Sequence, residues 1–426
     1  MTAKDNKLPL NFYILLISRL GSTFGSFLNM MAINIFLLEL TKDPLWIAYA
    51  MGTRVISGII AAPYSGYISD KVDRKKLMIT SDLVLAVAVA FLLIVPESVI
   101  KYYVLFLMIF IGVFSNLFEI NLRASIPSIL NQKDTMKANS LLMGGMNLTF
   151  ALSGLAAVFA YYLFKNYYPI FFLDSITYFI SGIILFFIKL STRPQIKSSQ
   201  VLENQKTCSL FNKLKNDYSK LPNLNNFNII IICLSILFLD AIASASHNIG
   251  FPVFSKDLDP QKPMFFYGLI LMFWGLGNII GIMFLNKAKF LKSLKAENLY
   301  LCFTAIMSAG MILIFQTNFI PIIIIAALIA GFGDGIYQTF YTSYIQKSED
   351  AVRGKLFALT SLVLRTGFGI GFIIVPIIMK ALPISTTVFL CHYPIVLISL
   401  LFITYFHTKH KTATLAQSSL NIALEL

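Results

Sequence analysis

Long apolar runs separated by short polar gaps constrain the fold of this chain more than any other feature. A helix needs about 20 apolar residues to cross a bilayer, and inside a bilayer only helices and closed barrels satisfy their backbone polar groups. Twelve such runs can be counted, at residues 10–40, 44–69, 76–95, 101–124, 138–163, 168–190, 223–252, 263–286, 297–316, 319–345, 354–380 and 384–406. The sequence therefore predicts an all-α integral membrane protein with twelve transmembrane helices.

Charged residues are few and lie mainly in the gaps. Only 13% of the residues are charged against 57% that are hydrophobic, a composition unlike that of soluble domains. The net charge of +14 would suit a nucleic-acid-binding surface, but the lysines form no basic stripe interleaved with aromatic residues. We therefore expect the lipid bilayer, and no nucleic acid, as a partner.

The distribution of Lys and Arg indicates how the chain is oriented in the membrane. Gaps and termini on one side carry 25 of these residues and those on the other side carry 6; the three arginines within apolar runs complete the total of 34. Loops rich in Lys and Arg stay on the cytoplasmic side. We therefore expect a multi-pass protein of the cell membrane with both termini in the cytoplasm.

One polar gap is much longer than the others and divides the runs into six and six. We expect an N-terminal six-helix half at 1–190, a cytoplasmic linker at 191–222, a C-terminal six-helix half at 223–406 and a cytoplasmic tail at 407–426. Short polar joints follow both the fourth and the tenth run, which indicates that the two halves are related. Such pseudo-symmetry places a substrate site between the halves, near the bilayer midplane.

Motifs of enzymes, metal sites and nucleotide-binding loops are absent from the sequence. It contains no HExxH pair, no P-loop and no Gly-x-Ser-x-Gly elbow. The four cysteines are far apart from one another, and the four histidines are spread over three separate regions: Cys208, Cys233, Cys302 and Cys391, and His247, His392, His407 and His410. We therefore expect no enzyme, no cofactor and no bound metal.

The loop after the second run carries a distinctive order of residues. It reads Gly66-Tyr67-Ile68-Ser69-Asp70-Lys71-Val72-Asp73-Arg74-Lys75-Lys76. Gly66 permits a tight turn and a close backbone approach. Asp70 places a carboxylate at the membrane edge, where it can cap the N-terminus of a neighbouring helix. The basic residues from Arg74 onward hold the loop on the cytoplasmic side.

This order, at this place in the chain, resembles the signature loop of the major facilitator superfamily. The resemblance implies that two six-helix halves rock about a central cavity and expose it to each side of the membrane in turn. It also implies a conformational latch made of Gly66, Asp70, Arg74 and Glu119. In this latch Arg74 is linked to Glu119, and Asp70 faces the start of the eleventh helix.

Two further stretches narrow the resemblance to one branch of the superfamily. The residues from Arg123 through Ile126-Pro127 to Ala138-Asn139-Ser140-Leu141, together with Arg353-Gly354-Lys355-Leu356-Phe357, resemble macrolide-efflux and enterobactin-exporter-like proteins. This implies proton-coupled export of an amphipathic small molecule such as a siderophore or a macrolide drug. The fifth run, however, lacks the proline of the exporters' Gly-Pro-rich signature.

Four charged residues lie near the middle of apolar runs, where ionisable groups are costly and usually functional. They are Arg54, Asp240, Asp334 and Arg365. The arginines would attract an anionic group of a substrate. Asp240 or Asp334 would carry a proton, because burial favours the neutral form of a carboxyl group. The alternative is that the four residues form static ion pairs or solvated cavity walls.

The residues leave three functions open. A secondary exporter, acting as a monomer on a small molecule and protons, is the first. An uptake permease of the same fold for a small anionic solute is the second. A membrane enzyme or receptor that transports nothing is a remote third, since no reactive cluster or added soluble domain is visible.

Overall fold

The described part of the chain is helical throughout. The computed structural model describes residues 8–130, 135–188, 227–288, 296–346, 348 and 350–425. Its elements in chain order are α1 (Leu10–Thr41), α2 (Leu45–Lys71), α3 (Arg74–Ala90), the short 3-10 helix η1 (Phe91–Leu93), α4 (Glu97–Ile129), α5 (Thr135–Phe164), α6 (Tyr168–Phe187), α9 (Phe227–Leu258), α10 (Pro263–Lys287), α11 (Ala296–Phe315), α12 (Ile320–Gln346), α13 (Asp350–Ala381) and α14 (Ile384–Glu425).

The twelve predicted spans are confirmed. Each of the twelve α-helices in the described residues contains a stretch long and apolar enough to cross a membrane. The last helix differs most from the prediction, because α14 continues from its apolar part to Glu425, through the residues expected to form a tail. The expected linker at 191–222 lies outside the described residues.

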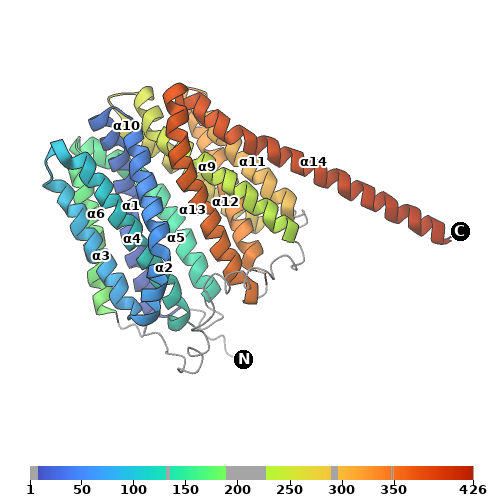
Figure 1. Cartoon of the computed structure of the whole chain (residues 1–426), viewed down its shortest axis with the longest axis horizontal. Helices are drawn as coiled ribbons and strands as arrows, with labels where there is room; N and C mark the ends of the chain where they lie inside the picture. Colours follow the sequence, from blue (N-terminus) through green and yellow to red (C-terminus); the bar gives the residue numbers. More distant parts are fainter. Residues whose placement is uncertain are drawn as a thin grey trace.

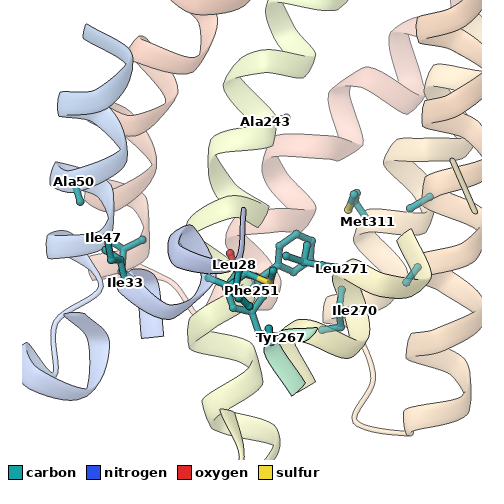
Figure 2. Packing of buried hydrophobic residues seen from close by; sticks show 14 of the residues in the cluster. Leu28, Ile33, Ile47, Ala50, Ala243, Phe251, Tyr267, Ile270, Leu271 and Met311 are labelled. Carbon is teal, nitrogen blue, oxygen red and sulfur yellow. The ribbon is translucent and has the colours of Figure 1, made fainter. Parts of the chain in front are cut away.

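The helices form two bundles that lie side by side (Figure 1). Helices α1 to α6 contact one another on one side, and helices α9 to α14 do so on the other. The main contacts between the bundles join α5 to α10 and α2 to α13. A single buried apolar cluster includes residues of both bundles, such as Leu28 and Ile33 of α1 with Phe251 and Tyr267 (Figure 2).

Glycines allow helices of the C-terminal bundle to approach at backbone distance. A Cβ atom added at Gly277 of α10 would overlap the carbonyl oxygen of Leu328 in α12. One added at Gly331 of α12 would overlap the carbonyl oxygen of Trp274 in α10. Helix association in membranes depends on such close packing, because the lipid is as apolar as the side chains. The α10–α12 seam therefore requires these glycines.

Small residues also form the seam between the bundles. A Cβ added at Gly154 of α5 would lie 2.9 Å from the carbonyl oxygen of Gly268 in α10. Nearby, Asn34 Nδ2 of α1 donates a hydrogen bond of 3.3 Å to the hydroxyl of Tyr267 in α10. On the α2–α13 seam, Gly52 lies against Phe372. The two bundles are thus held by close backbone contact and one buried polar contact.

These contacts lie on one side of the membrane. We call the side at which α1 begins the N-terminal side, and the opposite side the far side. Gly154, Asn34 and Gly52 all lie in the halves of their helices nearer the far side. On the N-terminal side, a Cβ added at Gly66 of α2 or Gly354 of α13 would meet no atom of the described residues within 4 Å. In the described part of the chain, the closest contacts between the bundles thus lie toward the far side, and nothing packs against these two glycines.

Replacing Gly331 with Ala should destabilise the protein, because the new methyl group overlaps the backbone of α10. Overpacking of this kind typically costs about 1–3 kcal/mol. The matched control is Gly369→Ala in α13, where an added Cβ meets nothing within 4 Å. Thermal unfolding of the detergent-solubilised variants checks this. Equal midpoints for the two variants would contradict the packing described for the α10–α12 seam.

Candidate substrate and proton site

A pocket lies inside the N-terminal bundle, between α1, α2, α4 and α6. It is narrow, with a cavity volume of about 20 Å³, and it has a mixed lining of polar, methionine and branched apolar side chains. We call it the polar pocket, and its polar residues are Ser26, Asn29, Asn34, Arg54, Asp174 and Tyr178. Its edge reaches the seam between the bundles, because Asn34 bonds to Tyr267 of α10.

Asp174 is the buried acid of the polar pocket. Its side chain is 1% exposed, and its Oδ2 accepts a hydrogen bond of 2.6 Å from Asn29 Nδ2. Helix α6 can bring Asp174 this close to α1 because residue 25 is glycine; a Cβ there would lie 2.7 Å from Asp174 Oδ1. The Oδ1 atoms of Asp174 and Asn29 are buried and have no hydrogen-bond partner among the described residues. Two acceptor oxygens are thus unused.

Arg54 supplies the positive charge of the polar pocket. It comes from α2, lines the pocket, and is partly exposed. Its charge interacts electrostatically with Asp174 and Tyr178. In the described part of the chain, however, its guanidinium group makes no hydrogen bond and no ion pair within 4.0 Å. Arg54 is therefore available to a ligand.

A second polar group, the acidic cluster, lies in the C-terminal bundle and consists of Asp240, Asp334 and their hydrogen-bond donors. Tyr337 donates from its hydroxyl to Asp240 Oδ2 at 3.0 Å. Asp334 Oδ2 accepts from Asn278 Nδ2 at 2.9 Å, and its Oδ1 accepts from Gln338 Nε2 at 2.5 Å. Asp240 and Asp334 are 4% and 7% exposed, and their charges interact. The cluster therefore holds two buried carboxyl groups close together.

In the described part of the chain, no cation is paired with the acidic cluster. Among the described residues, both ion pairs involve Glu119, and none joins Arg54 or Arg365 to Asp240 or Asp334. Arg365 of α13 instead donates from Nη2 to Asn116 Oδ1 of α4 at 3.0 Å, which links the two bundles through a neutral amide. The static pairing considered as the alternative from the sequence is therefore not formed in this conformation.

The predicted link between Arg74 and Glu119 is not formed in this conformation, so it stays a prediction for the state that is closed on the cytoplasmic side. Arg74 begins α3, and its Nη1 donates to the carbonyl oxygen of Ala124 in α4 at 2.8 Å. Glu119 is paired with Arg19 of α1 at 3.2 Å and with Arg123 at 2.6 Å. The face of α4 that carries Glu119 is thus turned toward α1. The side chain of Asp70 lies outside the part of the structure that is described.

Two histidines that are far apart in sequence meet in the C-terminal bundle. His247 Nδ1 of α9 and His392 Nε2 of α14 are 3.1 Å apart, with the rings stacked at 5.3 Å. His392 Nδ1 is 3.2 Å from Ser308 Oγ of α11. Neither this contact nor the role of Asp174 was predicted from the sequence. Each of these residues is an ionisable group inside an apolar run, and that position was the signal available in the sequence.

Twelve spans in two bundles, with a polar pocket in one bundle and a buried acidic cluster in the other, define a membrane transporter. The model of the Major Facilitator Superfamily matches residues 15–363, so the chain belongs to this superfamily of secondary transporters. The comparison with curated proteins finds no match. Membership of this superfamily indicates a transporter rather than an enzyme.

Solved structures of transporters share the fold. The chain is similar to the POT family transporter PepTSo, with a TM-score of 0.71 and 12% identity over 95% of this chain and 99% of that one. A POT family transporter in complex with a thioalcohol-conjugated peptide gives 0.69 and 13% over 93% and 96%. The nucleoside transporter NupG gives 0.68 and 12% over 93% and 100%. At these identities the likeness shows the fold alone.

Replacing Glu119 with Gln should destabilise the N-terminal bundle, because Arg19, whose side chain is only 13% exposed, would lose its counter-ion. We expect a loss of about 1–3 kcal/mol, below the ~3–5 kcal/mol of a fully buried pair. The control is Arg123→Gln, whose side chain is 62% exposed and whose ion pair is worth about 0–1 kcal/mol. Thermal unfolding in detergent measures both. A smaller effect for Glu119→Gln than for Arg123→Gln would contradict this assignment.

Proposed function

We propose that this transporter exports an amphipathic small molecule, siderophore-like or macrolide-like, in exchange for protons. The halves at 1–190 and 223–406, joined by the linker at 191–222, would rock about a cavity between them. The protein would act as a monomer in the cell membrane, with both termini cytoplasmic, and would serve siderophore export or drug resistance. The acidic cluster supports proton coupling most strongly.

Two buried carboxyl groups that have no cation beside them destabilise a membrane protein as long as both are charged. A charge in the bilayer is costly, and two like charges held close together repel each other. One proton removes the repulsion, and a second removes the remaining charge. The hydroxyl of Tyr337 and the amides of Asn278 and Gln338 can bond a carboxyl oxygen in either protonation state. Asp240 and Asp334 are therefore suited to bind and release protons as the bundles move.

The orientation and the latch belong to the same proposal. The excess of Lys and Arg in the loops on the N-terminal side supports a cytoplasmic location for that side. The open space around Gly66 and Gly354 then faces the cytoplasm. Because Arg74 and Glu119 are not paired in this conformation, we assign their pairing, together with Asp70, to the state that is closed on the cytoplasmic side.

Arg54 and Arg365 favour a second candidate function, uptake of a small anionic solute. Neither guanidinium group is paired with a carboxylate among the described residues. An anion entering between the bundles would therefore meet two available positive charges. The fold serves either direction of transport, so the direction must be measured.

Everted membrane vesicles with an acidic interior and a pH-sensitive dye test proton-coupled export. A carboxylate siderophore, a catecholate siderophore, a macrolide and a cationic dye are added one at a time, against vesicles lacking the protein. Alkalinisation of the interior that requires the protein supports the proposal. If no solute of the panel changes the dye signal although the protein is folded, the proposal is overturned. Accumulation of a labelled anionic solute by whole cells would then establish the uptake permease.

Replacing Asp240 or Asp334 with Asn should abolish proton movement driven by the substrate. Asn keeps the hydrogen-bonding shape and cannot release a proton, so we expect at least a tenfold loss of dye response. The control is Asp82→Asn in α3, a buried carboxylate that accepts a hydrogen bond of 2.5 Å from Ser181 outside the acidic cluster. A normal response in both cluster variants would exclude these residues as the proton carriers.

Replacing Asp70 with Asn should slow transport several-fold while leaving expression and thermal stability unchanged. The change removes the charge that would hold the cytoplasmic side closed and preserves the size of the side chain. Initial rates of substrate transport in vesicles, normalised to the amount of protein, measure the effect. Wild-type rates at equal expression would rule out a latch role for Asp70.

A further inference from the structure

We infer that His247 and His392, the histidine pair, form a proton relay that delivers protons from the far side of the membrane to the acidic cluster. The inference deepens the proposed function, because it rests on the acidic cluster exchanging protons during transport. It gives a role to two buried ionisable groups that the proposed function does not use, since their side chains are 2% and 0% exposed.

The contact between the two rings can pass a proton. His247 Nδ1 and His392 Nε2 are 3.1 Å apart, and His392 Nδ1 is 3.2 Å from the hydroxyl of Ser308. A neutral imidazole has one N–H donor and one acceptor nitrogen, and a hydroxyl can serve in either role. When a proton arrives at His392 Nδ1, the proton on its Nε2 can pass to His247 Nδ1, and His247 releases its own proton from Nε2. One proton enters, one leaves, and the pair is neutral before and after the step.

Among the described residues, no charged side chain contacts the histidine pair. Toward the rings, α9 presents Phe251, α10 presents Trp274 and α11 presents Ser308, and none of these ionises near neutral pH. On α14, the thiol of Cys391 is next to the second histidine in the chain and interacts with Ser246. Neither ring takes part in an ion pair within 4.0 Å in this part of the chain. No fixed charge therefore holds the pair in one protonation state.

Two helices connect the histidine pair to the acidic cluster. On α9, Asp240, Ser244 and His247 are four and three residues apart, so they lie on one face of the helix. As the seventh span, α9 runs toward the far side, and the pair lies about 10 Å nearer to that side than Asp240. On α10, Trp274 packs against the His247 ring, while Asn278, one turn away, bonds to the acidic cluster. The Ser244 hydroxyl together with water can bridge the remaining gap.

Bundle movement can open and close this path, because the neighbours of the histidine pair also contact the N-terminal bundle. Trp274 packs against Phe150 of α5, with 5.5 Å between the ring centroids. One turn nearer the far side, Phe251 packs against the first histidine and against Tyr267, which bonds to Asn34 of α1 (Figure 2). Separation of the bundles on the far side would loosen both contacts. The pair would then be open to protons from that side.

Tryptophan fluorescence of the purified protein tests the relay without substrate or gradient. The chain has two tryptophans, so Trp46→Phe leaves Trp274 as the only one. A protonated imidazole quenches an indole that it contacts, so emission should fall about twofold or more between about pH 8 and pH 5. In the same background, His247→Gln should abolish this fall and the control His407→Gln should retain it. Emission that does not change with pH, or a fall that persists unchanged in His247→Gln, overturns the inference.

Transport by His392→Gln in vesicles separates a proton relay from a purely structural contact. Gln can hydrogen-bond its neighbours but cannot take up a proton. The dye response to the siderophore or macrolide that the wild type exports should therefore fall at least tenfold. Exchange of labelled for unlabelled solute without a pH gradient needs no net proton movement and should keep the wild-type rate. Equal losses of both rates, or no loss of either, overturn the inference.

The two measurements separate the inference from the proposed function. A fall in fluorescence that requires His247, with no dye response to any solute, would retain the proton-binding pair and remove export of these solutes. A dye response that is the same in the wild type and in His392→Gln would retain proton-coupled export and remove the relay.

Discussion

The cost of placing a charge in the bilayer is the constraint on which the rest of this structure depends. Helices satisfy the backbone internally, so the remaining cost falls on the few ionisable side chains within the spans. Glu119 meets this cost with two arginines near the N-terminal side. Asp174, Asp240 and Asp334 meet it only in part, through neutral amide and hydroxyl donors. In the proposed mechanism, this incomplete compensation would allow a proton or a charged solute to change the energy of the protein.

Close helix packing at glycines determines which parts of the protein can move relative to each other. The α10–α12 seam fixes Asn278 and Asp334 relative to each other within one bundle. The seam between the bundles, by contrast, consists of small residues and a few polar contacts, such as those from Asn34 to Tyr267 and from Arg365 to Asn116. A bundle that is rigid inside and lightly held to its partner can move as a body.

The sequence predicted the spans well because hydropathy depends on residue type alone. It also placed Arg54, Asp240, Asp334 and Arg365 inside the spans, since depth follows from position along a helix. The hydrogen-bond and ion-pair partners of these residues could not be predicted in this way. Tyr337 and Asp240 are 97 residues apart, and their contact depends on how α9 and α12 are rotated about their axes. The same rotation turned Glu119 toward Arg19 instead of Arg74.

The central claim is that the protonation state of the acidic cluster controls which side of the membrane is open. Spin-label distance measurements in a cysteine-free background test it most directly. One pair, Tyr64→Cys with Leu362→Cys, reports on the N-terminal side, and a second, Ser98→Cys with Asn318→Cys, reports on the far side. The account predicts that pH shifts the two distance distributions in opposite directions, and that adding Asp240→Asn and Asp334→Asn removes the shift. Two results would contradict the account. One is distance distributions that do not change with pH, and the other is a pH-dependent shift of the same size when both carboxyl groups are replaced.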